Sequence, residues 1–75
     1  MANVKLFGFH SMKVKNNSLT IEARNIEELL LKLSSLEPSL TLEELKRSLI
    51  FVNHKNITQL NMFKTKIDSS DNISI

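Results

Sequence analysis

The 75-residue sequence contains no cysteine, tryptophan or tyrosine, and it has only one glycine and one proline. Without cysteine the chain has neither disulfides nor thiolate metal ligands, so packing and hydrogen bonds must hold the fold. One glycine is too few for a glycine-rich phosphate-binding loop. No apolar run approaches the roughly 20 residues of a membrane-spanning helix, and the N-terminus lacks the basic-then-apolar pattern of a signal peptide. We therefore expect a cytoplasmic protein that does not associate with membranes.

Composition and charge set the broad class of the protein. A hydrophobic fraction of 41% is enough for one compact core, and the length corresponds to a single domain, residues 1–75. The net charge is +2, and the ten basic residues are spread along the chain. Because a nucleic-acid-binding protein usually concentrates its basic residues on one face, the sequence predicts no nucleic-acid partner.

Residues 3–9 alternate in the manner of a β-strand. Val4 and Leu6 fall on one face, which suits a sheet packed on a core. Phe7 and Phe9 fall on the other face. These outer aromatic side chains have two interpretations: they turn into a second small cluster, or they form an apolar docking patch.

Two segments lead from this strand to the first helix. Residues 10–17 are polar and predict a connecting turn, in which Met12 and Val14 could extend a hairpin arm. Residues 18–23 alternate cleanly between apolar and polar side chains. Because connections are usually short, the strands at 3–9 and 18–23 should pair as an antiparallel hairpin.

A capping box predicts where the main helix begins. The Asn25 side chain can accept from the first free N–H groups, and Glu28 stands three positions later. The helix should end near Leu36, because the next residue precedes the only proline. Its apolar stripe contains Ile26, Leu29, Leu30 and Leu33, and is broadened by Leu31 and Leu36.

A second capping box, Thr41 with Glu44, predicts a short helix that ends before Ile50, although part of this segment could be an ordered loop. The apolar stripe expected for this helix contains Leu42, Leu45 and Leu49. A leucine stripe such as that of the main helix usually belongs to the core.

The following segment predicts a second hairpin. Residues 49–52 form a dense apolar run, in which Ile50 and Val52 should point inward. Residues 53–56 have the composition of a turn, and residues 57–60 should form the returning arm.

The last stretch, residues 67–75, combines a polar turn with an alternating run. Ile73 and Ile75 point one way, which is typical of a strand with one buried face. The resulting order of elements is that of the β-grasp, or ubiquitin-like, fold. We expect an α+β domain in which a mixed sheet of four or five strands packs on one main helix, with a short second helix. The first and last strands should lie side by side, parallel, at the centre of the sheet.

No self-contained active site is evident in the sequence. His10 and His54 fall in predicted turns, without clustered carboxylates nearby, so both are interpreted as solvated turn residues rather than metal ligands or bases. Ser69 and Ser70 have no neighbouring base that could activate them as nucleophiles. We therefore predict a protein without enzyme activity, catalytic residues, metal or cofactor, which works by presenting a surface or a terminus.

Several segments resemble the small sulfur-carrier proteins: the small subunit of molybdopterin synthase, the thiamine sulfur carrier and the ubiquitin-related modifiers. The resemblance covers nearly the whole chain and depends on the order and spacing of its motifs. The segments concerned are Val4-Lys5-Leu6-Phe7-Gly8, Asn25-Ile26-Glu27-Glu28-Leu29-Leu30, Phe51-Val52-Asn53-His54 and the closing residues 67–75.

The resemblance implies a carrier that docks to protein partners, namely an adenylating enzyme and the large subunit of a synthase. In that family a C-terminal Gly-Gly is adenylated and converted to a thiocarboxylate, which donates sulfur to a molybdenum-cofactor or thiamine precursor or to tRNA. This sequence has Ser70 where the family usually has glycine, and no Gly-Gly follows Ile75 at the end of the expected carrier strand. Ile75 is therefore not expected to serve as the activated terminus.

By the same resemblance, Phe7 corresponds to an exposed aromatic residue that packs on the activating enzyme. Phe9 and Leu60 are added as further predicted docking residues. One alternative is a ubiquitin-like interaction domain without carrier chemistry, which binds a protein through its open sheet face. Another is a small RNA-binding or toxin–antitoxin-like module, whose support is the mild positive charge.

Overall fold

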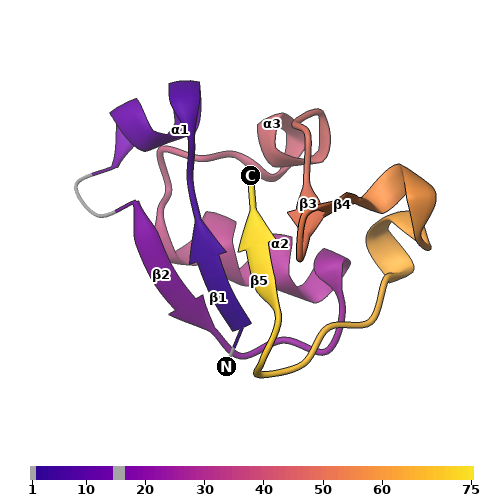
Figure 1. Ribbon diagram of the computed structural model, residues 1–75. Coiled ribbons are helices and arrows are strands. Elements are labelled where there is room, and N and C mark those ends of the chain that lie inside the picture. The colour runs from indigo at the N-terminus through magenta and orange to yellow at the C-terminus, as the bar shows by residue number, and fades with distance from the viewer. Residues whose placement is uncertain (1, 15–16) are drawn as a thin grey trace.

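One mixed sheet of five short strands, in the order β2-β1-β5-β3-β4, forms a layer that is covered on one face by helix α2 (Figure 1). The structure is a computed structural model that describes residues 2–14 and 17–75, without the side chain of Phe9. Along the chain the elements are β1 (Ala2–Lys5), α1 (Gly8–Lys13), β2 (Ser18–Ile21), α2 (Ile26–Leu36), α3 (Leu42–Lys46), β3 (Phe51–Val52), β4 (Lys55–Asn56), the 3-10 turns η1 (Ile57–Gln59) and η2 (Met62–Lys64), and β5 (Asn72–Ser74).

The first and last strands lie parallel at the centre of the sheet, as predicted. Val4 of β1 is in register with Ile73 of β5. On either side of this pair the contacts are antiparallel, because β2 pairs with β1 and β3 pairs with β5. This arrangement, with one long helix across the sheet, confirms the β-grasp expectation.

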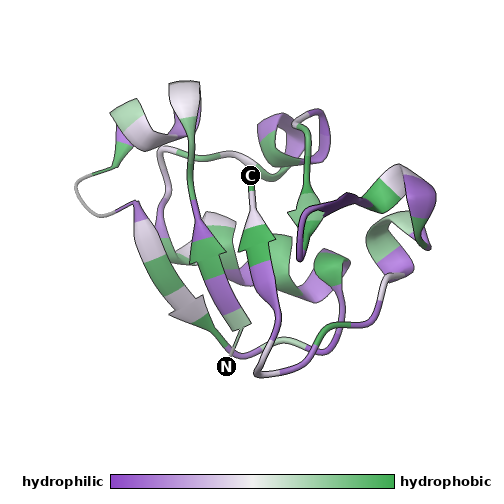
Figure 2. Cartoon of the chain, viewed as in Figure 1, coloured by the Kyte–Doolittle hydropathy of each residue, from purple (hydrophilic) through white to green (hydrophobic). Residues whose placement is uncertain are grey.

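Alternation along the central strands separates a buried face from an open face. Figure 2 shows hydrophobic and hydrophilic residues following one another along β1 and β5. The hydrophobic members point toward α2, where residues of all layers form one core. The buried hydrophobic residues are Ala2, Val4, Leu6, Ile21, Ile26, Leu29, Leu30, Leu33, Leu40, Leu45, Ile50, Val52, Ile57, Ile67, Ile73 and Ile75.

Helix α2 has the predicted start and the predicted apolar stripe. The Asn25 side chain accepts a hydrogen bond of 2.8 Å from the backbone N–H of Glu28, as a capping residue does. The four residues of the main stripe are buried, but Leu31 and Leu36, which were expected to broaden it, are exposed. Leu31 lies about 100° around the helix from Leu30 and therefore off the buried stripe, and Leu36 is the last residue of α2.

Helix α3 also begins at its predicted cap, since Thr41 Oγ1 accepts from the backbone N–H of Glu44. Leu45 is completely buried, whereas Leu49, which was expected to share its apolar stripe, is 69% exposed. The helix ends at Lys46, and Arg47 caps it. Beyond this point the helical spacing that linked Leu49 to Leu45 no longer applies.

The segment after β1 differs from the prediction. The first strand ends at Lys5, and Gly8 adopts a left-handed backbone with φ of 55°. The chain then forms the short helix α1, where a polar turn with a possible hairpin arm at Met12 and Val14 was expected. Residues 15–16 of the predicted turn lie outside the described part of the chain.

The second hairpin is shorter than predicted. Phe51 pairs with Asn56 and Val52 with Lys55, so only two residues, at 53 and 54, form the turn. Both have positive φ, as in a type I′ turn, which matches the twist of the flanking strands. The expected returning arm at residues 57–60 is instead the 3-10 turn η1.

None of the helices within residues 2–14 and 17–75 is long and apolar enough to cross a membrane.

Candidate protein-docking surface

Two adjoining hollows lie beside the final strand, on the side of the sheet that α2 does not cover. The first is lined by Phe7, Leu49, Phe51, His54, Ser74 and Ile75. The second shares three of these residues and is lined by Asn3, Val4, Lys5, Phe7, Ser18, His54, Asn72, Ile73 and Ser74. The lining of both hollows is here called the Phe7 face. Figure 1 shows that β5, whose residues line both hollows, ends between α1 and α3.

Phe7 is directed outward by the backbone that follows β1. Leu6 is buried, and the alternation leaves the next side chain, that of Phe7, 55% exposed. The backbone N–H of Phe7 donates to the carbonyl of Ile75 at 2.8 Å, and the N–H of Ile75 donates to the carbonyl of Lys5 at 2.9 Å. These bonds continue the parallel pairing beyond β5, so Phe7 lies directly beside the end of the last strand.

The other apolar members of the face come from the segment that leads into β3. Ile50 and Val52 are buried, so Leu49 and Phe51 point the opposite way. Leu49 is strongly exposed and Phe51 is half-buried. Exposed apolar side chains gathered in one place are typical of interaction sites.

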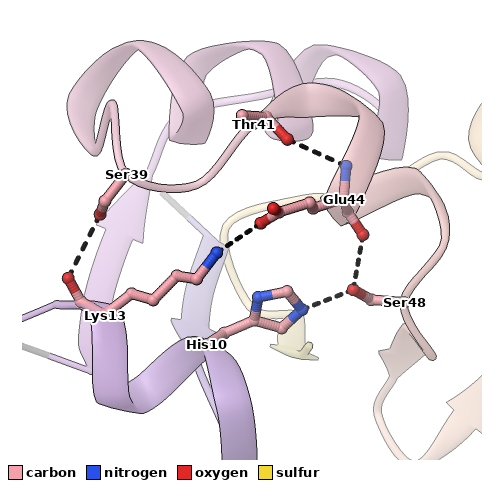
Figure 3. Close-up of polar contacts among 6 residues, drawn as sticks. All are labelled: His10, Lys13, Ser39, Thr41, Glu44 and Ser48. Atoms are coloured by element: carbon pink, nitrogen blue, oxygen red, sulfur yellow. Dashed lines mark hydrogen bonds and ion pairs between the residues drawn. The ribbon is translucent and has the colours of Figure 1, made fainter.

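Polar contacts between α1 and α3 fix the segments that carry Phe7 and Leu49 (Figure 3). His10 Nε2 lies 2.5 Å from Ser48 Oγ, and Lys13 Nζ lies 2.7 Å from Glu44 Oε2. Helix α1 begins directly after Phe7, and Ser48 directly precedes Leu49. The contacts therefore hold the two sides of the first hollow at a set separation.

The second hydrogen bond of the Ser48 hydroxyl indicates which group donates in its contact with His10. Ser48 Oγ donates to the backbone carbonyl of Glu44 at 2.8 Å, so His10 Nε2 is the donor to Ser48 Oγ. The pair has a structural role, and the prediction that His10 is a solvated turn residue was wrong, because it is half-buried in α1.

The ion pair between Lys13 of α1 and Glu44 of α3 depends on the ionisation of the Glu44 carboxylate. The hydrogen bond from Lys13 lowers the pKa of Glu44 below its usual value. Glu44 is therefore ionised at neutral pH, and its charge attracts the Lys13 ammonium across the gap between α1 and α3.

Asn53 fastens the β3–β4 turn to the start of β5. Its backbone N–H donates to the carbonyl of Asn72 at 2.8 Å, and its Oδ1 accepts from the N–H of Asn72 at 2.9 Å. Its Nδ2 donates to Asp71 Oδ1 at 2.8 Å. The adjacent turn is closed by Asp68, whose pKa is lowered by hydrogen bonds from the side chain and the backbone of Ser70.

The polar residues of the Phe7 face give it a positive character. Lys5 and His54 line the hollows, together with amide and hydroxyl side chains. Among the described residues, no aspartate or glutamate lines either hollow. His54 has a φ of 73°, in the left-handed region that most side chains avoid.

The predicted docking residues are only partly brought together. Phe7 and Ile75 line the same hollow, although the Ile75 side chain is itself buried. Leu60 is partly exposed, follows η1 beyond β4 and lines neither hollow of the Phe7 face. The side chain of Phe9 lies outside the described part of the chain. The docking role of Phe7, Phe9 and Leu60 stays a prediction, as does the role of Ile75 as the end of a carrier strand.

Sequence reasoning missed Leu49, Phe51 and His54 as members of this surface. The signal for the first two was present, because inward Ile50 and Val52 place their alternate neighbours outward. No local pattern indicated that His54 would face the end of β5. Within residues 2–14 and 17–75, no group of three or more histidine, cysteine, aspartate or glutamate side chains could hold a metal ion.

Comparison with known proteins identifies solved structures of similar fold. No protein-family model matches the chain, and no curated protein sequence matches it significantly. The chain is similar to the small archaeal modifier protein 1 (SAMP1) from Methanosarcina acetivorans, with a TM-score of 0.83 and 23% identity over 97% of this chain and 87% of that one. It is also similar to a chain of the Amycolatopsis orientalis BexX/CysO complex, with a TM-score of 0.82 and 8% identity over 99% and 91% of the two chains.

A third similar structure is that of the Haloferax volcanii HVO 2177 protein, with a TM-score of 0.74 and 14% identity over 97% of this chain and 77% of that one. At these identities the similarity is one of fold. It confirms the ubiquitin-like β-grasp fold that the resemblance to small sulfur carriers implied.

Proposed function

We propose that this chain is a non-catalytic, sulfur-carrier-like protein that docks through the Phe7 face to an adenylating enzyme, to the large subunit of a synthase, or to both. The observation that carries the proposal is the apolar rim beside the end of the last strand, where exposed Phe7 and Leu49 flank Ile75. The motif resemblance to sulfur carriers supports the same role. So does the similarity of fold to a modifier protein and to a chain of a two-protein complex.

The position of this rim suits a protein that presents its last strand to a partner. The backbone bonds of Ile75 to Lys5 and Phe7 hold the strand end in one place relative to the rim. A partner bound on Phe7 and Leu49 would therefore meet the chain beyond Ser74 at a fixed distance. Such fixed placement of a reacting group is what a carrier has to supply, because the chemistry belongs to the partner.

Binding to a cognate adenylating enzyme tests the proposal. We expect Phe7→Ala to weaken binding about tenfold or more, as for an exposed aromatic anchor in an interface. Leu36→Ala is the matched control, because Leu36 is 61% exposed on α2 and does not line the Phe7 face. Circular dichroism of both variants checks that the fold is retained. Equal binding by the wild type and Phe7→Ala would reject this docking site.

Carrier chemistry is tested on the protein as the cell makes it. Carrier activity would give pyrophosphate exchange with the adenylating enzyme and, with a sulfur source, the mass increase of oxygen replaced by sulfur at the C-terminus. Binding without either reaction would favour the second candidate, a ubiquitin-like interaction domain without carrier activity. That candidate is supported by the Phe7 face itself, which lies on the open side of the sheet and offers an apolar rim to any protein partner.

A further inference from the structure

We infer that His54 and Lys5 form the polar half of the Phe7 face and recognise a carboxylate on an acidic partner segment, whose apolar side chain packs between Phe7 and Leu49. The inference rests on the proposed docking function, because it assigns the chemistry of the partner to that same surface. Three observations carry it: the backbone conformation of His54, the place of its side chain, and the charge of the lining.

The fold does not account for a histidine at position 54. Its φ of 73° is left-handed, a conformation that favours glycine because a side chain with Cβ is crowded there. Asn53, in the same turn, has a structural role through its bonds to residues 71 and 72. The side chain of His54 is exposed, and within the described residues it makes no hydrogen bond comparable to those of Asn53. Residues held in this conformation are often found at ligand-binding positions.

The side chain of His54 lies where the two hollows meet. It lines both of them, together with Phe7 and Ser74, and so borders the apolar rim on one side and the polar strands on the other. Lys5 lines the second hollow from β1. A ligand that spans both hollows would therefore contact an apolar wall and a pair of nitrogen donors at once.

The charge of the lining determines the sign of the partner. Lys5 is cationic, the imidazole of His54 offers an N–H donor, and no aspartate or glutamate side chain of the described residues lines either hollow. Complementary charge across an interface favours the matching partner and disfavours one of like sign. A protein segment fits better than a nucleic acid, because a nucleic-acid face needs several cations and this one combines a single lysine with an apolar rim.

Selection from a random peptide library displayed on phage tests the inference, with the intact chain as the immobilised protein. The selected peptides are synthesised and titrated against the wild type, Phe7→Ala, His54→Gly, Lys5→Gln and the control Leu36→Ala. Glycine at position 54 suits the left-handed backbone, so His54→Gly removes the side chain without straining the turn. A short oligothymidylate is titrated in parallel.

We expect the selected peptides to pair an aspartate or glutamate with a nearby large apolar residue. His54→Gly and Lys5→Gln should each weaken a selected peptide about five- to tenfold, as for a charge-assisted hydrogen bond at an interface. Replacing the peptide carboxylate by the amide should abolish the effect of His54→Gly, because the two groups act as a pair.

The outcomes separate the inference from the function on which it rests. Peptides that depend on Phe7 but lack acidic residues, or that bind His54→Gly as well as the wild type, overturn the inference and leave the docking surface intact. If no selected peptide depends on Phe7, both are wrong. Displacement of a bound peptide by the oligothymidylate, weakened steeply by salt, would make the face a nucleic-acid site and overturn the inference as well.

Discussion

Removing the Asn53 side chain should destabilise the whole domain, although the residue is exposed on the surface. Asn53 joins the β3–β4 turn to β5 through two side-chain hydrogen bonds and one backbone bond. It also has a φ of 50°, which asparagine tolerates better than alanine does. Two variants separate these effects. Asn53→Gly removes only the side-chain bonds, whereas Asn53→Ala removes them and also strains the backbone.

The magnitudes follow from the bonds that are lost. Each side-chain hydrogen bond contributes about 0.5–1.5 kcal/mol, and the exposure of this site favours the lower half, so Asn53→Gly should cost about 1–2 kcal/mol. Alanine in the left-handed region adds about 1 kcal/mol, which brings Asn53→Ala to about 2–3 kcal/mol. A domain of this length has a total stability of roughly 4–11 kcal/mol, so either loss is a large fraction of it.

Urea unfolding followed by circular dichroism measures both losses. With an m-value of about 1 kcal/mol/M, the midpoint of Asn53→Ala should fall by about 2–3 M, and that of Asn53→Gly by about 1–2 M. Asn3→Ala is the control, because Asn3 is an exposed amide in an ordinary strand, with one side-chain bond of 3.3 Å. Midpoints of both Asn53 variants equal to that of the control would refute the reasoning. Equal losses for glycine and alanine would refute its backbone part.

Two further predictions concern the turns beside the Phe7 face. The pKa of Asp68 is lowered in the folded state, chiefly by the Ser70 hydroxyl, so its ionised form stabilises the fold above the unfolded pKa of about 3.9. The stability advantage of the wild type over Asp68→Asn should therefore be constant from neutral pH down to about 5 and disappear as the pH falls through the lowered folded pKa, which urea titrations at several pH values would detect. His54→Gly should raise the free energy of unfolding by about 0.5–1 kcal/mol, since relief of the left-handed strain exceeds the entropic cost of glycine. A thermal unfolding midpoint at or below that of the wild type would contradict this.

The parts of the fold that could be predicted are those set by local signals. Helix α2 was recognisable because a capping box and a leucine stripe on adjacent turns both indicate a helix that starts after Asn25. The inward residues of β1, β3 and β5 followed from period-two alternation. The parallel pairing of β1 with β5 was predicted from the order of elements, which is that of the β-grasp fold.

The parts that could not be predicted depend on contacts between distant residues. Helix α1 has no side-chain cap and no acidic residue in its first turn, so no local sequence signal predicts where it begins. It is joined to α3 by His10 and Lys13, whose partners are 38 and 31 positions away. The same limit applies to the candidate site. Phe7 was found by alternation, whereas the place of His54 depends on a two-residue turn whose length the sequence did not reveal.

The pairing of β1 with β5 has a consequence for how the chain folds. The side chains of Asn3 and Asn72, which lie 69 positions apart, meet across the centre of the sheet. During synthesis on the ribosome, β1 therefore cannot pair with β5 until almost all of the described chain has been made. During that interval the β1–β2 hairpin and α2 lack the strand that connects them to β3. Contacts of such long sequence separation slow folding, so the sheet is completed late and its unpaired strand edges are exposed until then.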